Sequence, residues 1–308
     1  MSQDFASTRA VVGVHPAPHT LEGEGFEVAR AIPGPSFQSI GPFIMLDHFG
    51  PKDYGPGEAK GAPEHPHFGI ETLTYMFEGF GLHRDSIGNT SITGPGEAQW
   101  MRAGRGIVHD EGADPKAQEA GGRSHGVQLW INLPRGKREA DPEYKAIRAS
   151  DIPELHQDQS TIRLLAGTLG GVTGPVTSFS PPWLAHISVP AGASLQLAAP
   201  SGIDLGAYVV SGSGRFGTDG IPAKGDDLVR FARSGDGIGI VADSDLEILV
   251  LGGPPVDWPI LRYGPFVADT KDELLRAVRD FQTGKMGLID FSKPIPERPI
   301  GRVTIKAA

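Results

Sequence analysis

The decisive stretch of the sequence is YMFEGFG at residues 75–81, because it returns as YVVSGSG at residues 208–214. Its tyrosine and both glycines recur at an offset of 133 residues. Further along, Pro95–Glu97 aligns with Lys224–Asp226 at an offset of 129 residues. Glycine-rich turns can resemble one another by chance, but matches in the same order favour two copies of one unit.

Each copy follows the same pattern of strand, glycine turn, strand, glycine–acid turn and strand. An apolar run closes the first copy at residues 127–131 (VQLWI) and the second at residues 246–250 (LEILV). Short strands between turns predict a β-barrel or sandwich for each unit. With 43 glycines, 27 prolines and few helical patterns, the composition favours an all-β fold of two barrels packed together.

A length of 308 residues suits two domains. We expect one barrel at residues 1–140 and a second barrel at residues 141–308. The boundary is placed there because the surrounding segment is polar and contains Pro134, Pro142 and Pro153.

One short helix is predicted near the end of the chain, at about residues 270–284. Thr270 and Glu273 form a capping box, in which each side chain accepts a hydrogen bond from a free backbone N–H of the first turn. Leu274, Val278 and Phe281 then share one helix face. We expect this face to pack against a barrel.

Charge and cysteine content exclude several classes of function. The formal net charge is -9 without a basic stripe, so direct nucleic-acid binding is not expected. The absence of cysteine excludes disulfides, thiolate metal sites, iron–sulfur clusters and cysteine nucleophiles. The first residues lack the pattern of a signal peptide, and no apolar run approaches the ~18 residues of a membrane span. A cytoplasmic location is expected.

Two short motifs place metal-binding side chains two residues apart. His65 and His67 flank a proline and lead into residues 68–75, which read as a strand rich in Ile, Thr and Tyr. His109 and Glu111 have the same spacing. Because residues i and i+2 point to the same face of a strand, each motif can present two ligands to one ion. Together they offer three imidazoles and one carboxylate.

The order of the two motifs within one unit is similar to that of a cupin barrel. Glu71, four residues after His67, also fits the general cupin pattern HxHxxxE. By simple parity Glu71 shares the face of His65 and His67, unless a bulge intervenes. Spacing alone therefore leaves Glu71 and Glu111 as alternative carboxylate ligands.

The second copy has apolar residues where the first has these histidines and Glu111. By the offsets above, the corresponding positions are Ala198, Pro200, Ile238 and Ile240. We expect an apolar core in their place, and therefore one metal per chain.

The chain resembles the pirin family of bicupin proteins, some of which are described as quercetinases. The resemblance spans nearly the whole chain, and its most specific stretch is AGRGIVH at residues 103–109. Further matching stretches are GPF at 41–43, HPHFGIET at 65–72, QWM at 99–101 and YGPFV at 263–267. The resemblance implies that His65, His67, His109 and Glu111 are the metal ligands. Glu71 would then contact a ligand or line the pocket.

The resemblance implies Fe²⁺ as the ion, although Mn, Ni, Cu, Co or Zn suits such donors. It also implies a flavonol 2,3-dioxygenase that consumes dioxygen and releases carbon monoxide. The ion would lower the pKa of the flavonol 3-hydroxyl, and Glu111 would accept its proton as the catalytic base. Trp100, Phe77 and Trp130 would form an apolar pocket or pack in the core. Arg105 would steady an anion or remain a surface charge.

The same family implies a second reading, in which the protein regulates a transcription factor or a metabolic enzyme and iron is a redox-sensitive cofactor without turnover. An enzyme needs a cavity that reaches the metal and admits a two-ring aromatic. A regulator needs only a surface over a closed site, and the fold alone does not separate the two. Another cupin reaction, such as decarboxylation or sugar isomerisation, fits the specific stretches less well.

Overall fold

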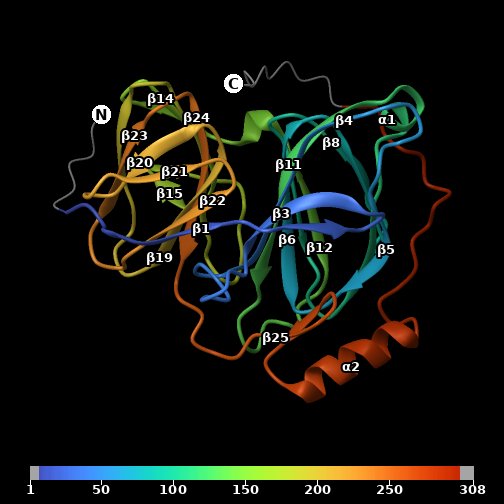
Figure 1. Ribbon diagram of the computed structural model, residues 1–308. Helices are drawn as coiled ribbons and strands as arrows, with labels where there is room; N and C mark the ends of the chain where they lie inside the picture. Colours follow the sequence, from blue (N-terminus) through green and yellow to red (C-terminus); the bar gives the residue numbers. More distant parts are fainter. Residues whose placement is uncertain (1–6, 299–308) are drawn as a thin grey trace.

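The computed structural model describes residues 7–298 and consists almost entirely of β-strands. Residues 1–6 and 299–308 lie outside the described residues. They include the outer ends of the two predicted domains and the first residues of the segment that we expect to lack a signal-peptide pattern. Two barrels lie side by side (Figure 1), and each combines a seven-stranded sheet with a four-stranded sheet. The predicted all-β fold of two cupin barrels with a short C-terminal helix is confirmed.

The first barrel has the strand order β12-β9-β6-β11-β4-β3-β2 in its large sheet and β5-β10-β7-β8 in its small sheet. The strands of the large sheet are β2 (His19–Glu22), β3 (Phe26–Ile32), β4 (Phe43–Tyr54), β6 (Ile70–Glu78), β9 (Ala98–Arg102), β11 (Gly122–Asn132) and β12 (Glu143–Ile147). Those of the small sheet are β5 (Ala62–His67), β7 (Gly81–Asp85), β8 (Thr90–Thr93) and β10 (Ile107–Glu111).

The second barrel repeats this arrangement strand for strand, with the orders β1-β22-β19-β24-β17-β14-β13 and β18-β23-β20-β21. Its large sheet contains β1 (Val11–Pro16), β13 (Glu154–Gln157), β14 (Ser160–Ala166), β17 (Trp183–Val189), β19 (Asp204–Ser211), β22 (Asp227–Phe231) and β24 (Leu246–Gly253). Its small sheet contains β18 (Ser194–Ala198), β20 (Ser213–Phe216), β21 (Ile221–Lys224) and β23 (Gly237–Ala242). A two-stranded sheet of β15 (Thr168–Leu169) and β16 (Val172–Thr173) follows β14. The matching strand orders support the duplication.

The sheets do not follow the predicted division at residue 140. Strand β1 pairs with β22 at the edge of the second barrel, and β12 pairs with β9 at the edge of the first. The prolines and polar residues around residue 140 predict a domain boundary there. Burial nevertheless alternates along β12, with Tyr144 partly covered and Glu143 and Lys145 exposed, as in a half-buried strand.

The large sheets of the two barrels contribute to one continuous core. Leu73 and Leu129 of the first barrel belong to the same cluster of buried apolar residues as Leu249 and Leu251 of the second. Two polar contacts cross this interface at corresponding places of the two copies. Tyr75 Oη lies 3.2 Å from His186 Nδ1, and Tyr208 Oη lies 2.9 Å from His48 Nδ1. His186 is thus a buried core residue with hydrogen-bond partners for both ring nitrogens.

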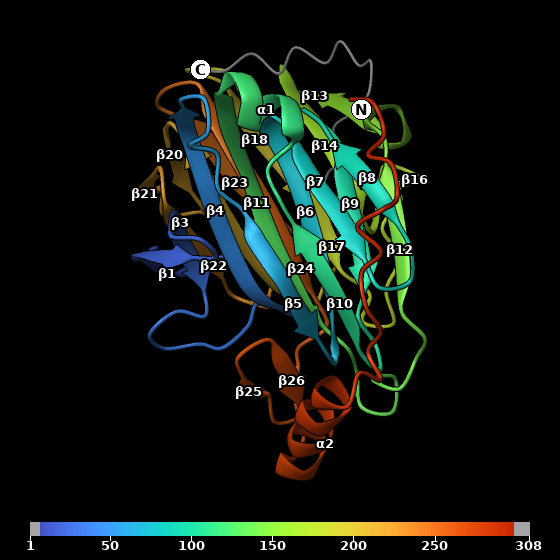
Figure 2. The ribbon, with the colours of Figure 1, turned by 90° about the vertical axis from the view of Figure 1, so that its right-hand side faces the viewer.

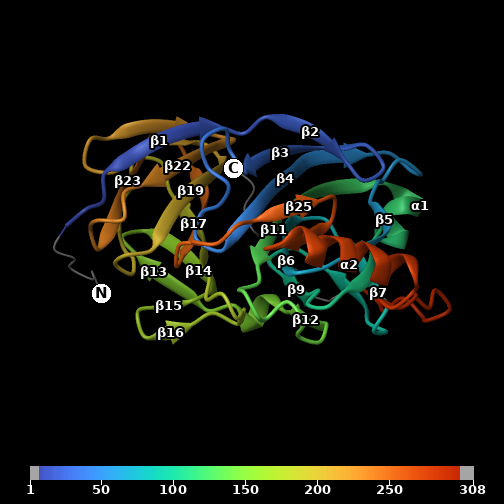
Figure 3. The same ribbon diagram turned by 90° about the horizontal axis from the view of Figure 1, so that it is seen from below.

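After the second barrel the chain returns to the first. A hairpin of β25 (Leu261–Tyr263) and β26 (Phe266–Ala268) leads into helix α2 (Lys271–Gln282), and both lie across one end of the first barrel (Figures 2 and 3). Phe266 of the hairpin and Leu274 and Val278 of the helix pack with Phe68 and Val108 of the first barrel.

The capping box of α2 forms as predicted, because Thr270 Oγ1 accepts from the Glu273 N–H and Glu273 Oε2 accepts from the Thr270 N–H. Two short helical turns were not predicted, α1 (Pro115–Ala120) and a 3₁₀ turn at Ala149–Asp151. Within residues 7–298, no helix has both the length and the apolar character needed to cross a membrane.

Candidate metal centre

Adjacent strands of the small sheet carry the three predicted histidines. His65 and His67 lie on β5, and His109 lies opposite His65 on the antiparallel strand β10. β5 is the edge strand of its sheet, where a proline such as Pro66 is tolerated because the missing N–H would face outward. The register therefore brings the three histidines to one place.

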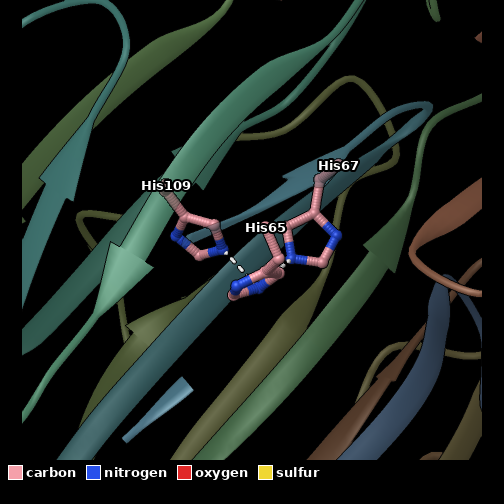
Figure 4. A group of neighbouring side chains, drawn as sticks. All are labelled: His65, His67 and His109. Carbon is pink, nitrogen blue, oxygen red and sulfur yellow. Dashed lines mark hydrogen bonds between the residues drawn. The ribbon is translucent and has the colours of Figure 1, made fainter. Parts of the chain in front are cut away.

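The three imidazoles point toward one another (Figure 4). His65 Nε2 lies 3.2 Å from His67 Nε2 and 2.9 Å from His109 Nε2. His67 and His109 are buried, and His65 is partly exposed.

Backbone carbonyls hold two of these rings by the nitrogen on the far side. His65 Nδ1 lies 2.7 Å from the Pro63 carbonyl oxygen, and His67 Nδ1 lies 3.2 Å from the Pro265 carbonyl oxygen in the β25–β26 hairpin. A carbonyl can only accept, so both Nδ1 atoms carry the proton and donate. Each Nε2 therefore presents a lone pair to the centre, as in metal-binding histidines.

Burial keeps the inner imidazoles neutral. Burial, with a smaller contribution from His65, lowers the pKa of His67 to about 3. Burial also places the pKa of His109 well below its usual value, and the neighbouring imidazoles lower it further. Neutral imidazole is the form that binds a metal. Three converging lone pairs repel one another unless a cation or a proton lies between them, so the donor set fits a metal ion.

Glu111 lies near His109 on β10, and its carboxylate accepts hydrogen bonds from two side-chain amides and one hydroxyl. Its Oε1 accepts from Thr74 Oγ1 (3.2 Å) and Gln99 Nε2 (2.9 Å), and its Oε2 accepts from Gln128 Nε2 at 2.5 Å. Candidate ligand atoms of Glu111, His109 and His83 all lie within 4.8 Å of one another, and those of His65, His67 and His109 form a second such group. The ligand role of Glu111 stays a prediction.

Glu71 occupies the opposite face of its strand, so the expectation that it lines the pocket is wrong. The run from residue 68 onward is not a continuation of β5, because Gly69 at φ 77° separates β5 from β6. Thr74 and Met76 on β6 line the cavity, whereas Glu71 is buried against the Trp100 Nε1–H at 3.3 Å. The parity argument fails because the turn changes the face.

A cavity of about 670 Å³ opens onto the centre and is lined by His65, His67, Glu111 and Trp130, among others. Of the three aromatic residues considered for it, only Trp130 contributes, since Phe77 and Trp100 are buried in the core between the barrels.

Two further predictions concern Arg105 and the second barrel. Arg105 is exposed and pairs with Asp141 at 2.9 Å, as a surface charge would. In the second barrel, Ile238 and Ile240 are core residues, and Leu197 and Leu195 lie opposite them. The offset that assigned Ala198 and Pro200 to the positions of the first histidine pair was therefore wrong by one residue, because His65 lies opposite His109 just as Leu197 lies opposite Ile238.

Sequence reasoning missed His83 and the amides of Gln99 and Gln128. His83 is buried beside His109, with ring centroids 5.4 Å apart, and its Nε2 lies 3.1 Å from Asp85 Oδ2. His83 and Asp85 have the same i, i+2 spacing as the two motifs that were recognised, which is a signal that could have revealed them. No local pattern marks the two glutamines.

Known proteins resemble this chain along most of its length. The family model described as Pirin matches residues 25–131, and the one described as Pirin C-terminal cupin domain matches residues 184–287. A pirin-like protein of Solanum lycopersicum is 34% identical over 93% of this chain and 96% of its own length. The pirin of Homo sapiens is 32% identical over 86% of this chain and 90% of its own length.

Solved structures agree with these matches. The structure of a quercetin 2,3-dioxygenase from Acinetobacter baumannii aligns with a TM-score of 0.86 at 34% identity, and covers 91% of this chain and 99% of that protein. Family models over both barrels, relatives over most of the chain and the shared fold agree, and the chain belongs to the pirin family.

Proposed function

We propose that this chain is a metal-dependent dioxygenase that acts on a flavonol or a similar small aromatic compound. The observation that carries the proposal is the cavity of about 670 Å³ that reaches His65, His67 and Glu111. Its volume lies within the ~300–1,000 Å³ typical of small-molecule sites. The Acinetobacter baumannii structure named as a quercetin 2,3-dioxygenase supports the same class of reaction.

In this proposal His65, His67, His109 and Glu111 hold one divalent transition metal per chain, for which we propose Fe²⁺. Three neutral imidazoles and a carboxylate suit such an ion. When bound, the ion supplies Lewis acidity toward a substrate hydroxyl and redox capacity toward dioxygen. The backbone carbonyls of Pro63 and Pro265 keep two imidazoles oriented throughout turnover.

Glu111 is the proposed proton acceptor. Thr74 and Gln99 both donate to its Oε1, whereas Oε2 has a single donor, Gln128. Oε2 is therefore the oxygen with capacity for the proton of the flavonol 3-hydroxyl. Trp130 provides an apolar wall on which an aromatic ring can lie, and such a wall excludes water from the reacting atoms.

The test is oxygen uptake by Fe²⁺-loaded protein with quercetin, with carbon monoxide measured as a product. His65→Ala with His67→Ala removes two proposed ligands and should abolish both metal binding and uptake. Glu111→Gln should lower the turnover rate by ~10²–10⁴-fold, as expected for a general base. His156→Ala removes an exposed histidine of the second barrel and should leave both measurements unchanged.

Two outcomes would contradict the proposal. Full metal content in the double histidine variant would place the metal elsewhere. A wild-type protein that binds one ion per chain but consumes no oxygen with quercetin or related flavonols would favour the regulatory reading.

A further inference from the structure

The three histidines of the centre differ in what their outer nitrogens contact. Those of His65 and His67 donate to backbone carbonyls, whereas the outer nitrogen of His109, Nδ1, is buried and has no hydrogen-bond partner among the described residues. If His109 Nε2 binds the metal proposed above, its Nδ1 must carry a proton. This inference rests on that metal centre: a buried N–H on one proposed ligand needs an acceptor.

His83 is the acceptor that the fold places nearby. β7 and β10 are antiparallel neighbours with Asp85 opposite His109, so His83 lies one pair further along, next to Glu111. His83 Nε2 lies 3.1 Å from Asp85 Oδ2, and this carboxylate also accepts from the N–H groups of Ile87 and Asn89. A carboxylate that accepts from several donors is ionised, so His83 Nε2 donates to it. His83 Nδ1 then has a free lone pair.

His83 cannot turn away easily, because its ring stacks on Tyr144 with centroids 4.3 Å apart and an interplanar angle of 16°. Tyr144 Oη donates to Gln99 Oε1 at 3.3 Å, and Gln99 Nε2 donates to Glu111 Oε1 at 2.9 Å. Strands β7, β9, β10 and β12 thus hold His83 and Glu111 in a fixed relation to each other, one pair along from His109.

We propose that His83, His109 and Glu111 bind one water molecule, and that through it His83 acts as a positioning residue for the His109 imidazole. One ring nitrogen of each histidine and one carboxylate oxygen of Glu111 all lie within 4.8 Å of one another, a separation that one water spans. The water accepts from His109 Nδ1–H and donates to His83 Nδ1 and to Glu111, which gives it the two to four polar partners that a buried water needs.

The same three side chains would also suit a second cation, but the protonation of His109 argues against it. With Nε2 bound to the first ion, Nδ1 would have to lose its remaining proton before it could bind another. A water needs no such loss, because it accepts from the N–H as it stands.

The direct experiment is a crystal structure of the whole chain loaded with Co²⁺, whose anomalous scattering distinguishes an ion from a water. We expect one anomalous peak at the Nε2 atoms of His65, His67 and His109. We also expect a water without anomalous signal, within hydrogen-bond distance of His109 Nδ1 and His83. An anomalous peak at the second position, or no ordered water there, would overturn the inference. Failure of Co²⁺ to bind at the three histidines would instead refute the proposed metal centre.

Two variants of His83 test the positioning role in solution, by chelator competition for Co²⁺. His83→Phe keeps a flat ring on Tyr144 but removes the acceptor, and should weaken binding by ~10–100-fold, as the loss of an outer partner does in other metal sites. His83→Asn loses volume but places an amide oxygen where Nδ1 was, so its affinity should stay closer to wild type than that of His83→Phe. A purely structural role predicts the opposite order, because the smaller side chain leaves a cavity.

The control for these variants is His186→Phe, which removes an equally buried histidine far from the centre, where it contacts Tyr75 and Glu247. It should lower the thermal midpoint of the metal-free protein without changing Co²⁺ affinity. Wild-type affinity in His83→Phe, or equal weakening in His83→Phe and His83→Asn, would contradict the inference. If His83→Phe does not fold, the comparison of His83→Asn with wild type and the crystal structure decide it.

Discussion

Glu71 is a carboxyl group held in apolar surroundings. It is fully buried between the barrels, and its Oε1 has no hydrogen-bond partner among the described residues. Burial raises the pKa of Glu71 to about 7 from the usual 4.5, and hydrogen bonds from Ser178 and Trp100 offset only part of this rise. The folded state therefore binds this proton more tightly than the unfolded state. The free energy of unfolding should fall as the pH rises from about 4.5 through about 7.

Glu71→Gln replaces the carboxyl group by a neutral group of the same shape, so the variant should lose this pH dependence. At ~1.4 kcal/mol per pKa unit, the stability of the variant relative to wild type should improve by about 3 kcal/mol across that range. Urea unfolding at several pH values measures the difference. Parallel stability profiles of the two proteins would contradict the burial argument. Metal affinity should not change, because Glu71 faces away from the centre.

At the scale of residues, the sequence predicted what depends on neighbours along one strand. The spacing of His65 and His67 fixes their common face, and the same holds for His109 and Glu111. The side of Glu71 was not predictable by parity, because the turn at Gly69 resets the alternation. The hydrogen bonds to Glu111 come from several different strands, and no spacing encodes such an arrangement.

Among the elements, the β25–β26 hairpin is joined closely to the corner between β5 and β6. The Val267 N–H donates to the Phe68 carbonyl at 3.1 Å, and a Cβ added to Gly69 would lie 2.0 Å from the Val267 carbonyl oxygen. Gly69 also has a φ of 77°, which other residues rarely adopt. The same hairpin carries the Pro265 carbonyl that holds His67.

Gly69→Ala should therefore destabilise the protein and weaken metal binding together. Gly57→Ala is a matched control, since Gly57 has the same φ of 77° but nothing within 4 Å of an added Cβ. The control should lose the ~1–3 kcal/mol of backbone strain alone. Gly69→Ala should lose more, because the hairpin must move. Denaturant unfolding and a metal titration measure both effects, and equal losses in the two variants would refute the role of the hairpin.

The elements differ in how well the sequence marks them. Helix α2 was predictable because its capping box and its apolar face are local signals. Strand β12 was not predictable, because the prolines on either side of it favoured a domain boundary over a strand. Its partner strand β9 lies at least 41 residues earlier, which is the separation between Glu143 and Arg102, and the pair Ile147 and Ala98 is further apart still. Such non-local pairing leaves no mark in the sequence of the segment itself.

For the whole molecule, the shared core makes the two barrels one folding unit. Apolar residues of both large sheets form one cluster, and the pairs Tyr75–His186 and Tyr208–His48 cross it. Separation of the barrels would expose this core and leave buried polar groups without partners. The repeat in the sequence predicted two similar barrels, but it could not predict that their edge strands would be exchanged.

We expect a single cooperative transition on heating the metal-free protein, with the calorimetric enthalpy equal to the van't Hoff enthalpy. Tyr75→Phe with Tyr208→Phe removes both phenol contacts across the interface and should lower the midpoint while keeping one transition. Differential scanning calorimetry provides the measurement. Two resolved transitions in the wild-type protein would mean that the barrels unfold independently.

The exchange of β1 and β12 also limits how such a chain can recombine with its relatives. A crossover near residue 140 would unite the β1 of one parent with the second barrel of the other, and would separate β12 from the β9 against which it evolved. The segments before and after residue 140 are therefore not interchangeable between relatives, even though the two barrels resemble each other. Functional chimaeras should inherit β1 together with the second barrel, and β12 and the terminal hairpin together with the first.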